Sequence, residues 1–290
     1  MSRGLGDVYK RQDIIKRTKQ IQEYLSERVF GQDNAVSVFV EGYFRAELSS
    51  LTDKSSNRPR ATFLFAGPPG VGKTFLAEKA AEAISYAEGK EIPFVRFDMS
   101  EYCDKESSLE FIGSDGVYKG SKSGNFTSFV KKNPRCLILL DEVEKAHPDV
   151  FNILLQILDD GRITDSQGRT VDFKNTIIIL TSNLGSQYLL DGIGPDGEIT
   201  ADAREHVQAE LRRAFRPEFL NRLDEILMFR PLTRDNLSHI IDNLIAALRS
   251  RLADRTLNLE MTDAAKALVI ENGYDPVYGA RPLKRYLQSA

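Results

Sequence analysis

Short apolar runs alternate with longer segments of helical periodicity over most of the chain. Five runs have the length and the β-branched or aromatic content of buried strands; they are residues 61–66, 92–98, 136–140, 176–180 and 225–229. The helical segments include residues 13–29, 35–48, 75–84 and 148–158. Strands that alternate with helices are typical of a parallel sheet covered by helices on both faces. The pattern therefore predicts an α/β domain over residues 13–230, with a short hairpin between turns at 159–162 and 166–169.

The pattern changes after residue 230, where the alternation of strands and helices ends. Thr233 can cap a helix, and apolar residues then recur at helical spacing: Leu237, Ile240, Ile241, Leu244, Ile245, Leu248 and Leu252. The elements expected to follow are a short strand at 257–259, a helix over 263–272 and a final helix from Arg281. They predict a small, mostly helical domain over residues 231–290. Because the chain stops within its last helix, we expect this domain to be truncated and the chain to be a fragment.

Residues 1–12 fit neither domain. They have neither the apolar core of a secretory signal nor an amphipathic pattern. We interpret them as a tail of uncertain origin and assign them no function.

The first predicted strand leads into a glycine-rich segment, residues 67–74 (GPPGVGKT), which fits the phosphate-loop pattern G-x-x-x-x-G-K-[ST]. Glycines let the backbone wrap closely around phosphate oxygens, and the N-terminus of the following helix offers free N–H groups. We expect Lys73 to reach the β- and γ-phosphates of a nucleotide and the Thr74 hydroxyl to hold Mg²⁺. The nucleotide-binding residues predicted here are Pro69, Gly70, Val71, Gly72, Lys73, Thr74 and Phe75. The alternative, a glycine turn with a solvated lysine, is disfavoured by the strand before the loop and the helix after it.

Polar side chains follow two of the predicted strands at the point where each strand ends. Asp141 and Glu142 follow the strand at 136–140, and Asn183 follows the strand at 176–180. Asp141 is suited to hold Mg²⁺, while Glu142 can polarise the water that attacks the γ-phosphate and Asn183 can orient that water. Acids also follow buried strands where a chain merely surfaces, and Asn is a common turn residue. The phosphate loop favours the catalytic interpretation.

Composition excludes several classes of function. The net charge of -3 gives no basic footprint for nucleic acid, and no apolar run reaches the ~18 residues of a membrane span. Cys103 and Cys136 have no metal-ligand spacing and suggest a reducing, cytoplasmic compartment. The three histidines, His147, His206 and His239, have no metal or triad spacing either.

Residues 139–183 (LLDEVEKAHPDVFNILLQILDDGRITDSQGRTVDFKNTIIILTSN) resemble the Walker B to sensor 1 block of Clp-type AAA+ ATPases. Residues 215–229 (FRPEFLNRLDEILMF) and 273–285 (GYDPVYGARPLKR) extend the resemblance. The chain is most similar to the second, C-terminal ATPase module of the ClpB-type disaggregases, with ClpA and ClpC relatives close behind. The resemblance covers roughly residue 28 to the C-terminus. It implies a P-loop AAA+ fold, in which helices sandwich a parallel sheet and a small helical lid domain follows.

The resemblance also implies roles for residues outside the phosphate loop. Residues 28–32, with Val29 and Phe30, match the family segment that packs on adenine, and Ile240 falls in its counterpart on the lid. Asn183 takes the sensor 1 role. Arg222 matches the arginine finger, which reaches the γ-phosphate held by the neighbouring subunit, and Arg281 matches sensor 2 on the lid. For an arginine considered without these motifs, a surface ion pair would be the more common role.

The family carries its substrate-gripping pore loop between positions equivalent to 113 and 124. Relatives have a Gly-aromatic-Val-Gly element there, whereas this chain reads GVYKG at 116–120 and is one residue shorter. Tyr118 is an aromatic side chain in a glycine loop, which suits it to grip an extended polypeptide. A tyrosine packed on its own loop is an equally good interpretation.

Together these features predict a motor that depends on ATP and Mg²⁺ and forms a ring, expected to be a hexamer. The motor is expected to thread unfolded or aggregated polypeptide through its pore, with a co-chaperone as a possible partner. One alternative is an unfoldase that feeds a peptidase. Residues 191–197 lie where protease-coupled relatives carry an Ile-Gly-Leu or Ile-Gly-Phe tripeptide, but Pro195 replaces the large apolar residue, which disfavours docking. A nucleic-acid motor or loader is disfavoured by the acidic balance of the chain. A scaffold that binds nucleotide without hydrolysing it is disfavoured because all the polar residues expected to carry hydrolysis are present.

Overall fold

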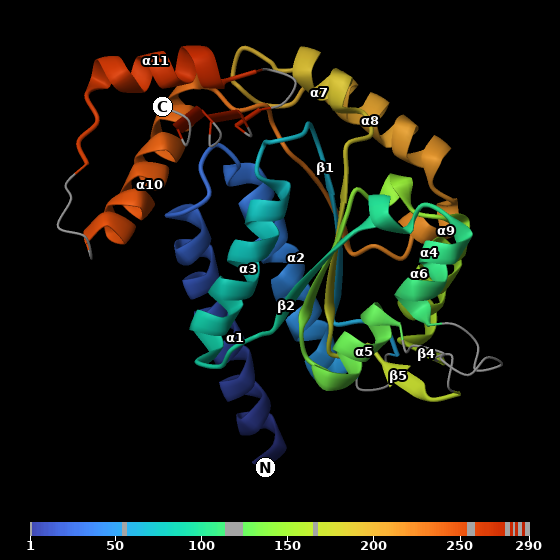
Figure 1. The fold of residues 1–290 in the computed structure, drawn as a ribbon. Coiled ribbons are helices and arrows are strands. Elements are labelled where there is room, and N and C mark those ends of the chain that lie inside the picture. The colour runs from blue at the N-terminus through green and yellow to red at the C-terminus, as the bar shows by residue number, and fades with distance from the viewer. Residues whose placement is uncertain are drawn as a thin grey trace.

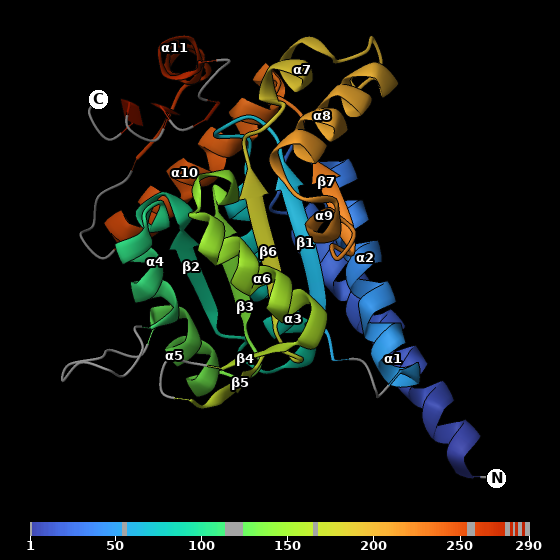
Figure 2. The ribbon, with the colours of Figure 1, turned by 90° about the vertical axis from the view of Figure 1, so that its right-hand side faces the viewer.

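The computed structural model describes residues 2–53, 57–113, 124–164, 168–253, 259–275, 279–280, 282–283 and 286–287. It confirms the predicted fold class. Five parallel strands form the main sheet in the order β2-β3-β6-β1-β7, and helices cover both faces (Figures 1 and 2). The strands are β1 Ala61–Ala66, β2 Phe94–Asp98, β3 Leu137–Asp141, β6 Ile177–Ser182 and β7 Glu225–Met228. Each lies within a few residues of the predicted range.

Alternate side chains of the central strands divide the large domain into two apolar cores. Phe63 and Phe65 of β1 face one core, which contains buried residues of α1 (Ser2–Ser26), α2 (Asp33–Thr52) and α3 (Lys73–Glu88). Leu64 and Ala66 face the other core, against the remaining helices. These helices are α4 Lys105–Ile112, α5 Asn125–Lys132, α6 Pro148–Asp160, α7 Ser186–Asp191, α8 Ala201–Ala214 and α9 Pro217–Leu220, with two 3-10 turns, η1 Met99–Tyr102 and η2 Val143–Lys145. All three fully buried strands, β1, β3 and β6, lie in the middle of the sheet, as a two-sided core requires.

The first helix and the short hairpin of the large domain can be compared with the sequence predictions. The helix expected from residue 13 begins at Ser2, so the segment interpreted as a tail continues α1. The predicted hairpin is present as the antiparallel pair β4 (Arg162–Thr164) and β5 (Thr170–Asp172).

The small domain has a core of its own, made by α10 (Arg234–Ala253), α11 (Asp263–Gly273) and the helical residues near Leu283. Its buried residues are Leu232, Leu237, Ile241, Ile245, Val269 and Leu283. The strand predicted at 257–259 lies largely outside the described residues. Helix α10 lies on the side of the sheet that α1 and α3 cover (Figure 1). Among the described helices, none is long and apolar enough to cross a membrane.

An ion pair between a buried glutamate and a half-buried arginine joins helix α2 to the start of β1. The Glu47 side chain on α2 is only 5% exposed, and its Oε1 lies 2.6 Å from the Nε of Arg60. Arg60 also donates its backbone N–H to the Thr176 carbonyl, 2.8 Å away, at the start of β6. The pair therefore holds the entry of the first strand against helix α2.

Glu47→Ala is expected to lower the free energy of unfolding by about 2–3 kcal/mol, because removing one partner leaves the Arg60 charge half-buried without its partner. Urea unfolding followed by circular dichroism measures this loss. Glu41→Ala, at an exposed position on the same helix, should change stability by less than ~0.5 kcal/mol. A loss for Glu47→Ala as small as that of the control would contradict a structural role for the pair.

Candidate functional site

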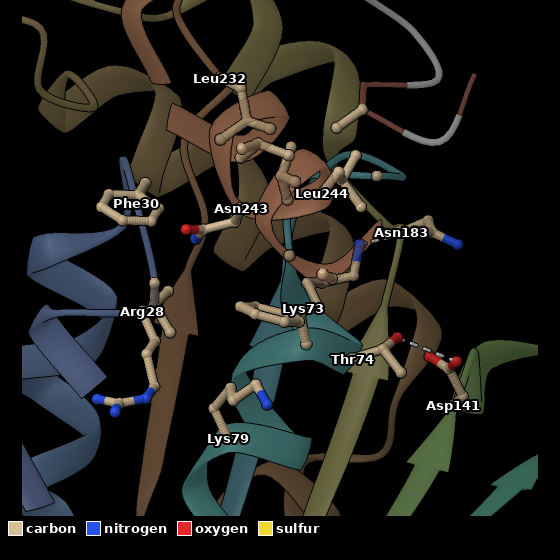
Figure 3. Close-up of a pocket in the computed structure, with 18 of the residues that line it drawn as sticks. Arg28, Phe30, Lys73, Thr74, Lys79, Asp141, Asn183, Leu232, Asn243 and Leu244 are labelled. Carbon is tan, nitrogen blue, oxygen red and sulfur yellow. Dashed lines mark hydrogen bonds between the residues drawn. The ribbon is translucent and has the colours of Figure 1, made fainter. Parts of the chain in front are cut away.

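A cavity of about 680 Å³ lies between the carboxyl edge of the sheet and helix α10 of the small domain (Figure 3). This volume is in the usual range for small-molecule sites. Its lining comes from residues 28–30 before α2, from the phosphate loop and α3, from the ends of β3 and β6 and, in the small domain, from Leu232, α10 and Ala280. Of the predicted site residues, the cavity brings together Val29, Phe30, Gly70, Val71, Gly72, Lys73, Thr74, Phe75, Asp141, Glu142, Asn183 and Ile240.

The phosphate loop has a backbone that only its glycines adopt without strain. Gly70 and Gly72 have φ angles of 71° and 104°, in the left-handed region that disfavours other residues. Gly72 is the N-cap of α3, so the free N–H groups of the helix begin at the cavity wall. The Lys73 ammonium folds back over the loop, where it donates to the carbonyl oxygens of Gly67 (2.6 Å) and Pro68 (2.8 Å). A buried cation and a helix N-terminus thus face the same end of the cavity, as phosphate binding requires.

Oxygen atoms gather around Asp141 at the end of β3. The Thr74 hydroxyl donates to its Oδ2 over 3.3 Å, and the Thr181 hydroxyl donates to its Oδ1. The guanidinium of Arg96, on β2, lies 2.7 Å from Oδ2. A carboxylate beside a hydroxyl is the donor set that Mg²⁺ prefers, so the residues present fit this ion. Thr74 and Asp141 would hold it, in competition with Arg96, and the bound ion would neutralise phosphate charge.

Glu142 is held in an unusual backbone conformation. Its φ of 56° is the single positive value for a non-glycine among the described residues, and such conformations cluster at functional sites. Its backbone N–H donates to the Thr181 hydroxyl at 2.9 Å. One carboxylate oxygen accepts from the Asn183 amide at 3.3 Å, and the other pairs with Lys145. The hydrogen bond from Lys145 lowers the pKa of the Glu142 carboxyl below its ordinary value.

Asn183 links the acid to the phosphate loop. Its side-chain oxygen accepts from Lys73 at 2.9 Å while its side-chain nitrogen donates to Glu142. Its backbone N–H donates to Glu144 at 2.9 Å, which fixes the start of the loop after β6. From this position the Asn183 amide can orient the same water molecule that Glu142 polarises.

Lys145→Met is expected to move the acidic limb of the pH–rate profile for nucleotide hydrolysis to higher pH. A general base acts only when ionised. Lys145 lowers the pKa of Glu142, so its removal raises that pKa and protonates more of the base at any given acidic pH. The profile of turnover against pH measures the shift. A profile with an unchanged acidic limb would mean that the pair does not control the protonation of the base.

The far end of the cavity is apolar and fits a nucleobase. Phe30 stacks on His239 with 5.3 Å between the ring centroids, which anchors the ring at the cavity wall. Arg28 lies 3.8 Å over the ring of Tyr24. Sequence reasoning missed the other lining residues, which are Lys79, Leu232, Asn243, Leu244, Ala247 and Ala280. Those on α10 follow Ile240 by three, four and seven residues and so share its face of the helix, but periodicity alone did not indicate that this face lines a cavity.

The small domain touches the phosphate loop directly. The backbone N–H of Ala280 donates to the Gly70 carbonyl at 3.1 Å. A side chain at Gly279, where φ is 61°, would lie 2.7 Å from the Gly70 carbonyl carbon and oxygen, so this contact needs glycine. Arg281, the predicted sensor 2, follows this contact but lies outside the described residues, as does Tyr118.

Arg222 does not line the cavity of its own chain. Its Nε lies 2.6 Å from the Asp159 Oδ1, and both side chains are more than a third exposed. The alternative interpretation, a surface ion pair, therefore describes its position within this chain. A residue that acts on a neighbouring subunit lies away from the cavity of its own chain, so the finger role of Arg222 remains a prediction.

The remaining predictions concern segments away from the cavity. Residues 191–197 form a turn: Ile193 pairs with Ile199 in an antiparallel bridge, and the Gly194 N–H donates to the Glu198 carbonyl at 2.8 Å. His147 accepts the Asp149 backbone N–H at the start of α6, and His206 stacks on Tyr188 with 4.8 Å between centroids. Within the described part of the chain, no group of three or more metal-ligating side chains is present.

Comparison with known proteins gives matches over nearly the whole chain. The family model for the AAA domain (Cdc48 subfamily) matches residues 58–226, and the model for the C-terminal, D2-small domain of ClpB protein matches residues 232–290. The chaperone proteins ClpB of Bacillus cereus and Nitratidesulfovibrio vulgaris are 53% and 51% identical over 270 residues, which are 93% of this chain and 30% of each relative. A cryo-EM reconstruction of Hsp104 with ATPγS and FITC casein in its closed state is similar with a TM-score of 0.81 and 36% identity, over 94% of this chain and 46% of that one. The chain thus spans about a third of the ClpB relatives and about half of the Hsp104 chain.

Proposed function

Because the chain belongs to the AAA domain family and ends in the small domain found in ClpB proteins, we propose that it is the C-terminal ATPase module of a ClpB-type disaggregase. The observation that carries this proposal is the meeting of Lys73, Asn183 and Glu142 in one hydrogen-bonded chain at the phosphate end of the cavity. These hydrogen bonds join Lys73, the cation proposed to bind the phosphates, to Glu142, the acid proposed to activate the attacking water. Fold alone would not distinguish a motor from a binding module.

In the proposed reaction, ATP lies with its base between Phe30 and α10 and its phosphates against the N-terminus of α3. Lys73 and the loop N–H groups bind the β- and γ-phosphates. Thr74 and Asp141 would hold Mg²⁺, which would neutralise phosphate charge there. Glu142 accepts a proton from the attacking water, and Asn183 orients that water beside it. Hydrolysis to ADP and phosphate follows.

The module is proposed to work as part of a ring, expected to be a hexamer. Arg222 of one subunit would complete the cavity of its neighbour, and Arg281 would report the state of the γ-phosphate to the small domain. The similar Hsp104 structure includes casein, a protein substrate. By analogy, the loop with Tyr118 would grip unfolded or aggregated polypeptide in the pore, with a co-chaperone as a further partner.

A direct test is ATP turnover in the presence of an unfolded polypeptide. We expect casein to raise the turnover of the chain, because substrate in the pore contacts every subunit of a ring. Double-stranded DNA at low salt should leave turnover unchanged. Stimulation by DNA and not by casein would support the nucleic-acid motor, and stimulation by neither would contradict the disaggregase proposal.

The peptidase-coupled alternative has less support. Its docking element would lie at residues 191–197, where Pro195 occupies the turn that Gly194 and Glu198 close. The relatives reported above are named as chaperone proteins. A pull-down with a peptidase ring would revive this alternative if the two proteins bound each other.

A further inference from the structure

Gln32 is a buried amide that joins two segments far apart in the sequence. Its side-chain nitrogen donates to the carbonyl oxygens of Val71, at 3.1 Å, and Arg230, at 2.8 Å. Its side-chain oxygen accepts the backbone N–H of Arg230 at 3.0 Å. The residue is 1% exposed. Both amide hydrogens and the oxygen are therefore bonded, which holds the side chain in one orientation.

The bond to Val71 sets the direction of one peptide in the phosphate loop. In a trans peptide the C=O and the next N–H point in opposite directions, and the described chain contains no cis peptide. A Val71 carbonyl held by Gln32 therefore turns the Gly72 N–H away from Gln32. Gly72 lines the cavity and is the N-cap of α3, where backbone N–H groups bind phosphate.

The bonds to Arg230 lie at the junction of the two domains. Arg230 follows the end of β7, and the core of the small domain begins two residues later, at Leu232. The Arg230 side chain is held in turn by Glu198, at 2.6 Å, and by the Gly197 carbonyl, at 3.0 Å. Gln32 thus connects the phosphate loop to this junction between the domains, called the hinge below, where the main chain and side chain of Arg230 are both bonded.

We propose that Gln32 is a positioning residue for phosphate binding. It holds the Val71–Gly72 peptide with its N–H toward the phosphates and transmits the position of that peptide to the hinge at Arg230. The ligand in this inference rests on the proposed function, because the phosphates are those of ATP or ADP. Gln32 is not among the residues that line the cavity, and its side chain bonds to Val71 and Arg230, so we expect its effect to depend on the number of phosphates and not on the base.

The test compares the affinities of ADP and AMP, measured by competition against a fluorescent ADP analogue. Gln32→Met keeps the length of the side chain and removes its three hydrogen bonds. The preference for ADP over AMP is expected to fall by at least ~10-fold, which is about 1.4 kcal/mol, while the affinity for AMP changes by less than ~3-fold because the base contacts remain. An equal loss for both nucleotides, or an unchanged preference, would overturn the proposal.

Hydrogen exchange of the Arg230 amide gives a second readout that a general loss of stability would not mimic. In the parent chain, ADP should slow this exchange, because bound phosphates fix the loop that Gln32 joins to the hinge. In Gln32→Met, ADP should still protect the phosphate-loop amides but no longer Arg230. Protection of Arg230 in the variant as in the parent would contradict the coupling.

Two further variants keep the test decisive. Gln22→Met, at an exposed position on α1, should behave as the parent. If Gln32→Met unfolds in a thermal scan, Gln32→Asn keeps a neutral amide that is one carbon too short to bond to both Val71 and Arg230, and the same loss of ADP preference is expected. A parent chain without preference for ADP over AMP would overturn the proposed function too, whereas a parent with that preference and unaffected variants would overturn the role of Gln32 alone.

Discussion

Glu142→Gln is expected to lower ATP turnover by about 10²–10⁴-fold, the usual contribution of a general base, and to leave ATP binding intact. The amide has the same shape as the carboxylate and can still bond to Asn183, but it cannot accept the proton of the attacking water. The strained backbone at Glu142 is held by Thr181 through the main chain, so the replacement should not disturb the loop. Single-turnover hydrolysis and binding of a fluorescent ATP analogue separate the two effects.

The matched control for this prediction is Glu205→Gln, at an exposed position on α8, which should hydrolyse ATP as the parent does. Parallel losses of binding and turnover in Glu142→Gln would place the residue in the binding of nucleotide. Full turnover in this variant would contradict its role as the base.

Arg222→Ala is expected to lower turnover by ~10³–10⁵-fold, the range for an arginine finger, with ATP binding in the isolated chain unchanged. The side chain pairs with Asp159 at the surface, and such exposed pairs contribute only about 0–1 kcal/mol to stability. A large kinetic loss in a folded protein would therefore come from the reaction and not from the fold. Turnover above the concentration at which the chain assembles is the quantity to measure.

Arg213→Ala provides the control for this effect. Arg213 lies on α8 and pairs with Glu210 at 2.8 Å, with a side chain that is 76% exposed. Its replacement removes a comparable surface ion pair and should leave turnover unchanged. If Arg222→Ala loses no more turnover than this control, Arg222 is a surface ion pair and nothing more.

The sequence was sufficient to predict the sheet and the phosphate end of the site. Buried strands such as β1 and β6 are short, apolar on both faces and bounded by turn residues, so their position needs no knowledge of the tertiary structure. In a parallel sheet the carboxyl ends of the strands meet at one edge, which brings Asp141 and Asn183 beside the phosphate loop. The positions of the strands along the sequence and the parallel order of the sheet are therefore enough to predict which residues meet at the phosphate end of the cavity.

The base end of the cavity and the links between domains depend on contacts that periodicity does not record. The family resemblance places Gln32 in the segment that packs on adenine, and only the fold places its amide against Val71 and Arg230. Arg96 alternates outward on an edge strand, yet it reaches Asp141 of the next strand. Both are polar residues whose partners are remote in the sequence.

Helix α8 was also missed, although its signals are present. Thr200 caps the helix by accepting the Ala203 N–H at 3.2 Å, and the buried residues Ala203, Val207 and Leu211 recur every four positions. Most of its other residues are polar or charged, so the apolar stripe is narrow and the average hydropathy of the segment resembles that of a loop. Cap and spacing together predict such a helix better than the overall hydropathy does.

The measurement that tests the central claim most directly is ATP turnover in a mixture of Arg222→Ala and Glu142→Gln chains. Each variant alone should be inactive. If the cavity is completed by a neighbouring subunit, an Arg222→Ala chain keeps Glu142 in its own cavity and receives Arg222 from an adjacent Glu142→Gln chain, so mixing restores part of the turnover. Recovery that depends on the mixing ratio is the predicted result, whereas a mixture as inactive as its components would contradict a site shared between subunits.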